Sequence, residues 1–375
     1  MRELVPVSSE EVAERLAAAL DGSGPALLPT APGEAAPPSL TGPVKEEIAL
    51  VVATSGSTGH PKGVLLSAAA LRASAEATHA RLGGPGAWLL ALGAHHIAGV
   101  QVLVRSLLAG EEPGVVDTSH GFRPDAFADA ARSVLDRPGR HYTSLVPTQL
   151  VRLLADAGAG LEALAAFDGL LLGGAAAPAE LVERAREAGV AAITTYGMSE
   201  TCGGCVYDGV PLDGVRVRLG EDGRISLSGP VLASGYRGAS NAAFADGWFH
   251  TDDLGRIEPD GRLTVLGRAD DMIITGGVNV APALVERVLC AEPDVLEACV
   301  VGLPHPEWGQ LVAAAVVPAD PATPPSAQRL RALVGARLGG PCAPKRIDIV
   351  AALPLRGPGK VDRRSLAEML INRER

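Results

Sequence analysis

The first apolar pattern along the chain has the period of an amphipathic helix. In residues 8–20, Val12, Leu16 and Leu20 recur at intervals of four and therefore share one face of a helix. Ser8 stands where an N-cap is expected, and a glutamate follows three residues later, which is the spacing of a capping box. We therefore expect a helix over residues 8–20 that buries one face.

After this helix, a segment rich in turn-forming residues is followed by a region in which strand and helix patterns alternate. Residues 22–43 are rich in glycine, proline and alanine and are expected to form a loop. From residue 48 to about 200, short β-branched or apolar runs alternate with helical patterns, which predicts βαβ units and a mostly parallel sheet with helices on both faces. The expected strands are 48–53, 87–92, 113–117, 141–146, 168–172 and 190–195, and the expected helices are 67–82, 97–109, 124–136, 147–156 and 178–188.

The remainder of the chain divides into two parts. Residues 213–267 are short alternating segments interrupted by Asp222-Gly223 and Asp260-Gly261, which are hairpin signals. Residues 270–375 predict a smaller α+β unit. Its expected helices are 282–290, 326–337 and 363–371, and its expected strands lie near 295–301, 311–317 and 346–350. The fold class is therefore α/β: a large N-terminal domain with mostly parallel sheets and a β-rich subdomain, followed by a small α+β domain.

Composition and charge narrow the classes of function. The chain has 375 residues, 47% of them apolar, and its 33 basic and 43 acidic residues give a net charge of −10. This balance argues against a general nucleic-acid or anionic-membrane binder, because both use basic patches. Five cysteines, an odd number, do not suggest a disulfide framework. We expect a cytoplasmic protein without membrane insertion, and the sequence leaves a homodimer open.

The strongest chemical signal is a loop that directly follows the expected strand 48–53. Glycines let backbone N–H groups turn toward a phosphate, hydroxyls add donors and a lysine adds positive charge. The lysine is not flanked as in a Walker A loop. The residues that we expect to contact phosphate are Thr54, Ser55, Gly56, Ser57, Thr58, Gly59 and Lys62.

This loop and four later segments, in the same order, resemble the motifs of the adenylate-forming superfamily of acyl-CoA synthetases, luciferases and peptide-synthetase adenylation domains. The later segments are Tyr196–Thr201, Gly247–Gly255, Gly267–Ile273 with Gly276-Gly277, and Gly357–Val361. The resemblance runs from about residue 47 to the end. It implies an enzyme that uses Mg²⁺, ATP and CoA and joins a carboxylic acid to the CoA thiol.

The resemblance also implies roles for individual residues around ATP. Glu200 would bind Mg²⁺, a hard cation that prefers carboxylate oxygens, and would take part in catalysis. Asp253 would hold the ribose, although Asp252 replaces the usual glycine before it and leaves two adjacent carboxylates as candidates. Arg268 would approach the ribose, with a salt bridge to Asp270 or Asp271 as the alternative. The other implied ATP contacts are Gly174, Tyr196, Gly197 and Thr201.

A mobile C-terminal lid is a further implication of the family. The chain would divide into residues 1–267 and 268–375, with Asp270 as the hinge near 268–271. Lys360 would be the catalytic lysine that the lid carries into the site, although an isolated C-terminal lysine is usually solvated. Gly276 and Gly277 would approach CoA.

The acid pocket is the least constrained part of the sequence. Arg105 lies in an apolar run after His95-His96; it would either meet a substrate carboxylate or extend to solvent at the helix surface. The segments Glu200–Gly209 and His95–Gly99 resemble the o-succinylbenzoate–CoA ligase branch, whose substrate has a second, ring carboxylate that would need a cation. The resemblance implies that the acid contacts His96, Arg105, Ser144, Gly173 and Gly197, with His96 also catalytic.

Two alternatives remain open at this point. The chain could be a ligase of the same superfamily for another acid, or a non-catalytic nucleotide-binding relative. In most of the superfamily the phosphate loop lies well over a hundred residues into the chain, whereas here it begins at residue 54. We therefore expect a reduced N-terminal subdomain.

Overall fold

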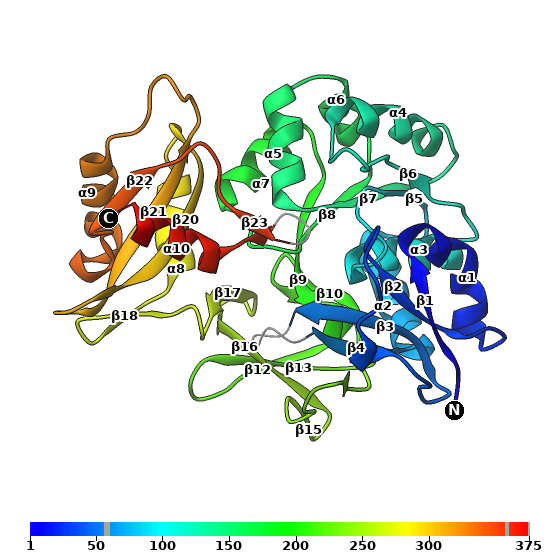
Figure 1. Cartoon of the computed structure of the whole chain (residues 1–375). Helices are drawn as coiled ribbons and strands as arrows, with labels where there is room; N and C mark the ends of the chain where they lie inside the picture. The colour runs from blue at the N-terminus through cyan, green and yellow to red at the C-terminus, as the bar shows by residue number, and fades with distance from the viewer. Residues whose placement is uncertain (56–60, 357–359, 374–375) are drawn as a thin grey trace.

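The computed structural model describes residues 1–55, 61–356 and 360–373. Figure 1 shows a large body that contains the N-terminus and a smaller lobe built from the C-terminal third of the chain. Three clusters of buried apolar side chains lie in the large body, and two others lie among residues 273–371. In the described ranges no helix is long and apolar enough to cross a membrane.

The N-terminal sheet has five strands in the order β1-β2-β3-β4-β14. The first three strands are parallel, and β4 and β14 continue the sheet in antiparallel pairs. Helix α1 (Ser9–Asp21) begins with the predicted capping box at Ser8 and buries Val12, Leu16 and Leu20. The strands are β1 (Leu4–Ser8), β2 (Ala26–Thr30), β3 (Ile48–Ser55), β4 (Pro61–Ser67) and β14 (Tyr236–Arg237).

The second sheet has seven strands in the order β11-β10-β9-β8-β7-β5-β6. Its part from β6 to β9 is parallel, and β10 and β11 are antiparallel additions at one edge. The strands are β5 (Ala87–Leu90), β6 (Gly114–Val115), β7 (His141–Leu145), β8 (Gly169–Leu172), β9 (Ala192–Met198), β10 (Gly203–Tyr207) and β11 (Val210–Pro211).

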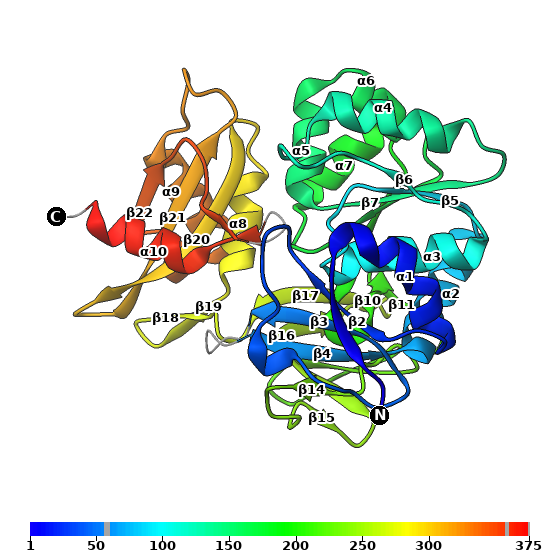
Figure 2. The ribbon, with the colours of Figure 1, turned by 45° about the vertical axis from the view of Figure 1, so that its right-hand side comes forward.

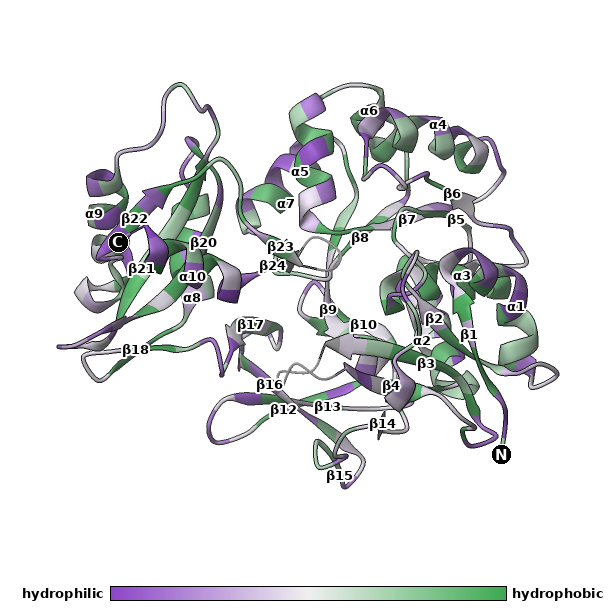
Figure 3. Ribbon diagram, viewed as in Figure 1, coloured by the Kyte–Doolittle hydropathy of each residue, from purple (hydrophilic) through white to green (hydrophobic). Residues whose placement is uncertain are grey.

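Helices cover both faces of this second sheet, as the alternation of patterns predicts. Buried side chains of α2 and α3 share one apolar cluster with the N-terminal sheet, whereas side chains of α4, α5, α6 and α7 form the cluster on the other face. Figure 3 shows α3 largely in hydrophobic colours, which fits its burial between layers. The helices are α2 (Ala68–Leu82), α3 (Ile97–Ala109), α4 (Pro124–Leu135), α5 (Pro147–Asp156), α6 (Ala159–Ala165) and α7 (Ala179–Glu187), with 3₁₀ turns η1 (Pro38–Leu40) and η2 (Ser199–Thr201).

A third sheet forms the β-rich subdomain in the order β12-β13-β16-β15, with β17 paired to β16. The two predicted Asp-Gly hairpin signals lie between β12 and β13 and between β16 and β17, and both glycines have the positive φ that such turns need. The strands are β12 (Arg216–Leu219), β13 (Arg224–Ser228), β15 (Phe244–Ala245), β16 (Trp248–Ile257) and β17 (Leu263–Arg268).

The small lobe is a sheet in the order β19-β18-β21-β20, with β22 beside β21. Side chains of α8 and α9 pack in one apolar cluster of the lobe and those of α10 in the other, and Figure 2 shows α10 and α8 on opposite sides of β20. The elements are β18 (Ile273–Thr275), β19 (Val278–Val280), α8 (Pro282–Cys290), β20 (Val295–His305), β21 (Gly309–Pro318), α9 (Ala327–Leu338), η3 (Gly340–Cys342), β22 (Arg346–Ile349), β23 (Leu355–Arg356), β24 (Lys360–Val361) and α10 (Arg363–Asn372).

Three sequence predictions about the N-terminal half are wrong. The expected loop 22–43 contains the buried strand β2, because Ala26, Leu27 and Leu28 are completely buried beside β1. The strand that begins at Ile48 belongs to the N-terminal sheet and not to the parallel sheet that follows it. The phosphate loop was expected between a strand and a helix, but it connects the antiparallel strands β3 and β4, which the alternating pattern alone did not reveal.

Candidate functional site

Glu200 occupies the centre of the candidate site. It lies in η2, directly after β9, and its side chain is buried. Lys62 from β4 donates to Glu200 Oε1 at 3.0 Å, and the Tyr236 hydroxyl from β14 donates to the same oxygen at 2.7 Å. A buried carboxylate needs such partners, because an unpaired charge away from water is costly. Glu200 is therefore not a solvated loop acid.

Glycines line the carboxyl ends of β8 and β9 beside Glu200. A Cβ on Gly197 would collide with the carbonyl oxygen of Gly203, and a Cβ on Gly173 would collide with Thr195 Oγ1. Gly174 has a φ of +80°, a conformation that favours glycine. These positions lie at the ends of parallel strands, which is where ligands of open α/β sheets bind. Thr201, also predicted here, is buried and bonded to the backbone of Met198 and Gly203.

The two adjacent aspartates have different surroundings. The Tyr196 hydroxyl donates to Asp253 Oδ2 at 2.8 Å, and the Asp253 side chain is only 16% exposed. Burial raises the pKa of Asp253, while the Tyr196 hydrogen bond and then Arg268 act to lower it. Asp252 is 59% exposed and pairs with Arg224 at 2.5 Å. Asp253 is therefore mostly buried and bonded to another predicted ATP residue, Tyr196, whereas Asp252 is exposed and forms ion pairs with Arg224 and, at 3.6 Å, with Arg268.

Arg268 takes the ion pair that was the alternative to a ribose contact. Its Nε and Nη2 donate to the two oxygens of Asp270 at 2.7 and 2.8 Å. The same guanidinium also lies 4.0 Å from Asp253 Oδ1, across the β16–β17 pair. Arg268 therefore joins the proposed hinge residue to the proposed ribose residue.

His96 and Ser144 belong to the same edge of the parallel sheet. His96 is the N-cap of α3, and its ring centroid lies 4.0 Å from that of His95, whose Nδ1 is 2.8 Å from Ser9 Oγ. Ser144 is buried near the end of β7, and its hydroxyl has no hydrogen-bond partner in the described ranges. Such an orphaned hydroxyl is available to a ligand.

Arg105 is buried and does not extend to solvent as the alternative prediction had it. It is 3% exposed, and its guanidinium carbon lies 5.0 Å from the centroid of the Trp88 ring. Its Nη2 is 3.5 Å from the Tyr207 hydroxyl, and its Nε has no partner in the described part of the chain. No ion pair with an acidic residue is found for it within those same residues. On helical geometry Arg105 lies roughly 13 Å along α3 from His96, so the two are at different depths of the large body.

Parts of the predicted site lie outside the described residues. Gly56, Ser57, Thr58 and Gly59 do so, as do the side chains of Ser55 and Lys360. Thr54 is in β3 opposite Lys62 of β4. The backbone of Lys360 is in β24, which pairs with β23. Figure 3 shows this pair of strands on the side of the small lobe that faces the large body. Gly276 and Gly277, both with positive φ, form the two-residue turn between β18 and β19.

The described residues hold no cluster of three or more His, Cys, Asp or Glu side chains that could enclose a metal ion. Cys202 and Cys205 are free, buried thiols whose pKa burial raises, so the CxxC spacing marks a packed segment. A single carboxylate such as Glu200 fits Mg²⁺ that arrives on the phosphates of a nucleotide and keeps several waters, which is how Mg²⁺ is commonly bound.

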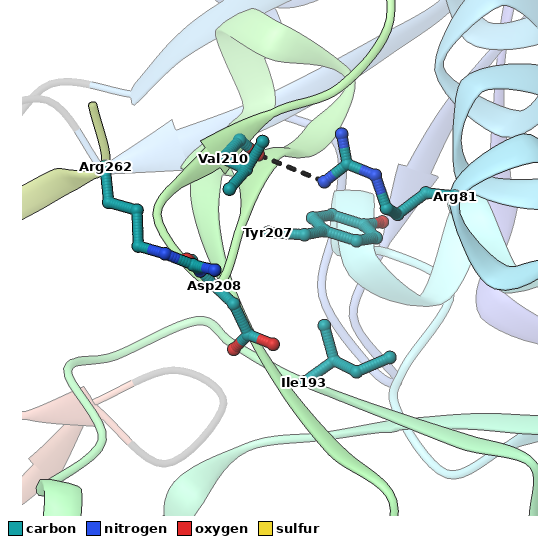
Figure 4. Close-up of a pocket in the computed structure, with 6 residues that line it drawn as sticks. All are labelled: Arg81, Ile193, Tyr207, Asp208, Val210 and Arg262. Carbon is teal, nitrogen blue, oxygen red and sulfur yellow. Dashed lines mark hydrogen bonds between the residues drawn. The ribbon is translucent and has the colours of Figure 1, made fainter. Parts of the chain in front are cut away.

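A cavity of about 360 Å³ lies elsewhere, and none of the predicted site residues lines it. It opens near the start of β9, and Figure 4 shows Arg81 at its edge donating to the carbonyl oxygen of Val210. Tyr207 separates this cavity from Arg105, since its ring lines the cavity and its hydroxyl reaches Arg105. The lining residues are Arg81, Ile193, Tyr207, Asp208, Val210 and Arg262.

Comparisons with known proteins identify the family of the chain. The family model of the AMP-binding enzymes matches residues 3–237, and that of the AMP-binding enzyme C-terminal domain matches residues 284–360. The chain belongs to the AMP-binding enzyme family. Within it, a relative from Mycobacterium tuberculosis strain H37Rv named "Probable 2-succinylbenzoate--CoA ligase" is 51% identical over 327 residues, which are 86% of this chain and 85% of the relative.

Two further members of the family extend the comparison. The 2-succinylbenzoate–CoA ligase of Geobacillus kaustophilus is 36% identical over 392 residues, covering 96% of this chain and 78% of the relative. A solved structure of o-succinylbenzoate CoA synthetase (MenE) from Bacillus subtilis, in complex with ATP and magnesium ion, superposes with a TM-score of 0.72 at 28% identity. It covers 96% of this chain and 82% of the solved chain. The α/β fold with a small C-terminal domain is thus confirmed.

Sequence reasoning missed Tyr236 and the surroundings of Arg105 in this family member. Tyr236 is in a two-residue strand without a motif of its own, and it reaches Glu200 through tertiary contacts such as the antiparallel pair of its strand with β4. Trp88 and Tyr207 come from β5 and β10, far from Arg105 in sequence. No local pattern could have predicted these contacts, since all of them depend on tertiary packing.

The contrast between the two aspartates gives a direct test of the ribose assignment. We expect Asp253→Asn to weaken ATP binding by about tenfold or more, because a hydrogen bond to a charged group contributes roughly 1.5 to 3 kcal/mol. Asp252→Asn is the matched control, and it should leave ATP affinity nearly unchanged because it alters an exposed ion pair. Calorimetric titration of both variants with ATP measures this, and the reverse order of losses would transfer the assignment to Asp252.

Proposed function

We propose that the chain is an ATP-dependent, AMP-forming acid–CoA ligase that converts o-succinylbenzoate to o-succinylbenzoyl-CoA in menaquinone biosynthesis. The observation that carries this proposal is the 51% identity, over 327 residues, with the M. tuberculosis relative that has this name. The buried Glu200 and the Tyr196–Asp253 pair at the carboxyl end of β9 support it as a nucleotide site. Use of ATP and CoA supports a location in the cytoplasm.

The reaction has two steps, and it needs only the acid, ATP and CoA as reactants. In the first, a carboxylate oxygen of the acid attacks the α-phosphorus of ATP and pyrophosphate leaves, giving an acyl-adenylate. In the second, the CoA thiolate attacks the acyl carbon and AMP leaves, giving the thioester. Bound Mg²⁺ would neutralise charge that develops on the phosphates. Glu200 would hold that ion, Lys62 and the loop from Thr54 would hold phosphates, and Asp253 would hold the ribose.

The small lobe would act as the lid in both steps. We infer that residues 268–375 rotate about Asp270, that Lys360 approaches the reacting carboxylate and α-phosphate in the first step, and that it withdraws in the second. A lysine suits this role, since positive charge placed where negative charge develops lowers the barrier. The Gly276-Gly277 turn would then approach the CoA chain, because two residues without side chains leave room for a ligand beside the backbone.

Arg105 supports a dianionic acid as the substrate. A fully buried guanidinium without an acidic partner among the described residues is an uncompensated charge, and burial lowers its pKa from the ordinary value. His79 and Trp88 add two more buried ring nitrogens that lack partners in those residues. The second carboxylate of o-succinylbenzoate would supply the missing negative charge while its first carboxylate reacts near His96, Ser144 and the glycines.

Product analysis tests the function as a whole. The protein is incubated with ATP, Mg²⁺, CoA and a panel of aromatic and aliphatic acids, and acyl-CoA products are identified by mass spectrometry. We expect the o-succinylbenzoyl thioester to form far faster than any other. If another acid is preferred, the protein is still an acid–CoA ligase but its substrate is not o-succinylbenzoate. If ATP binds and no acid is turned over, the protein is a non-catalytic relative.

Measuring the two half-reactions separately tests whether Lys360 acts only in adenylate formation. We expect Lys360→Ala to slow adenylate formation by about a hundredfold or more, because removing one preorganised charge-stabilising group has effects of this order. Transfer of CoA to chemically prepared acyl-adenylate should stay nearly normal, because the lysine has withdrawn. Stopped assays of each half-reaction measure both rates. Equal losses in the two halves would contradict the assigned role.

The Arg105 assignment predicts a loss that depends on the substrate. We expect Arg105→Gln to raise KM for o-succinylbenzoate by roughly ten- to a hundredfold, as for loss of a charged hydrogen bond, with little change in KM for ATP. Arg81→Gln, on α2 outside the proposed site, is the control. A monocarboxylic analogue that lacks the ring carboxylate should show no such difference between variants. An unchanged KM for o-succinylbenzoate would remove Arg105 from the pocket.

A further inference from the structure

Tyr236 contacts Glu200, the proposed Mg²⁺ ligand, but it has no role in the reaction proposed above. Its hydroxyl lies 2.7 Å from Glu200 Oε1, and the Lys62 ammonium lies 4.0 Å from the centroid of its ring. The Tyr236 side chain is 8% exposed. The hydroxyl is the donor in this contact, because a carboxylate oxygen only accepts.

We propose that Tyr236 is the positioning residue of the metal-binding carboxylate. Its hydroxyl fixes the orientation of Glu200, and its ring supports the Lys62 ammonium that reaches the same carboxylate. Both hydrogen bonds converge on Oε1, and within the described ranges none reaches Oε2. The geometry therefore assigns Oε2 to a divalent cation carried by the nucleotide and Oε1 to the protein.

Backbone hydrogen bonds hold the segment around Tyr236 close to Glu200 and β4, so the tyrosine can orient the carboxylate. Ala233 donates its N–H to the carbonyl oxygen of Glu200 at 2.9 Å, so the segment is bonded to the backbone of the residue whose side chain it orients. Ser234 and Gly235 form a reciprocal pair of backbone bonds with Leu65 of β4 at 2.8 and 2.9 Å. Tyr236 is thus held between the two elements that supply Glu200 and Lys62.

Packing against a second aromatic ring limits motion of the Tyr236 ring. Phe244 meets the Tyr236 ring edge to face, with 5.2 Å between centroids. The ring, its hydroxyl and its backbone therefore each have a fixed neighbour. Groups that orient a metal ligand in this way typically change metal affinity by about 10- to 100-fold when removed.

The inference rests on the proposed nucleotide site but not on the identity of the acid. The test therefore measures metal binding without any acid or turnover. Mn²⁺ replaces Mg²⁺ as the probe, α,β-methylene-ATP replaces ATP because it cannot release pyrophosphate, and free Mn²⁺ is measured by electron paramagnetic resonance. Binding of the metal-free analogue is measured in parallel by calorimetry.

We expect Tyr236→Phe, which keeps the ring and removes only the hydroxyl, to raise the Kd for Mn²⁺ in the presence of the analogue by about tenfold or more. Affinity for the metal-free analogue should stay near that of the wild type. Tyr142→Phe is the matched control, because Tyr142 is also buried and its hydroxyl is bonded to the carbonyl oxygens of Leu82 and Gly84 away from this site. It should leave both affinities unchanged.

Two results would overturn the proposal while the wild type still binds the metal–nucleotide pair. One is an unchanged Mn²⁺ Kd in Tyr236→Phe, and the other is an equal loss in Tyr142→Phe. Tyr236→Leu adds a second readout, because it also removes the ring that supports Lys62. We expect it to weaken binding of the metal-free analogue. Unchanged binding of that analogue to Tyr236→Leu would contradict the role of the ring. Absence of metal–nucleotide binding in the wild type would instead overturn the proposed function itself.

Discussion

The buried carboxylate of Glu200 is the point on which the arrangement of the site depends. It follows β9 of the seven-stranded sheet, but its two partners, Lys62 and Tyr236, come from β4 and β14 of the five-stranded sheet. A charge inside protein is tolerated only where partners compensate for lost hydration. The two sheets must therefore meet in one register at this point. Their shared apolar cluster supplies the general attraction, and the polar contacts at Glu200 select the alignment.

The same constraint explains why the site is at the ends of parallel strands. Strands β7, β8 and β9 end side by side, and the chain leaves them through Val146, Gly173 and the 3₁₀ turn that begins at Ser199. Glycine at the ends of β8 and β9 lets backbone segments approach more closely than any side chain would allow. Space for a ligand and fixed backbone N–H and C=O groups thus arise from the topology.

Sequence reasoning succeeded where the information is local. The capping box at Ser8, the helix at 97–109 and the two Asp-Gly turns depend on residues within a few positions of one another, and each is found in the structure. It failed where pairing is non-local. Strand β2 has no alternating pattern, because burial on both faces removes it. The tyrosine that holds Glu200 is 36 residues away along the chain, so no spacing rule could have linked them.

The ion pairs inside the small lobe differ from those at the proposed hinge, and the difference suits a lobe that rotates as a rigid unit. Arg363 is bonded to both oxygens of Glu286 and to the carbonyl oxygen of Val300, joining α10 to α8 and β20 inside the lobe. Arg268, at the proposed hinge, is 45% exposed and shares its charge among Asp270, Asp252 and Asp253. Exposed pairs contribute only about 0 to 1 kcal/mol each, so exchanging one for another costs little. The lobe can therefore keep its own packing while the contacts of Arg268 change, as rotation about Asp270 would require.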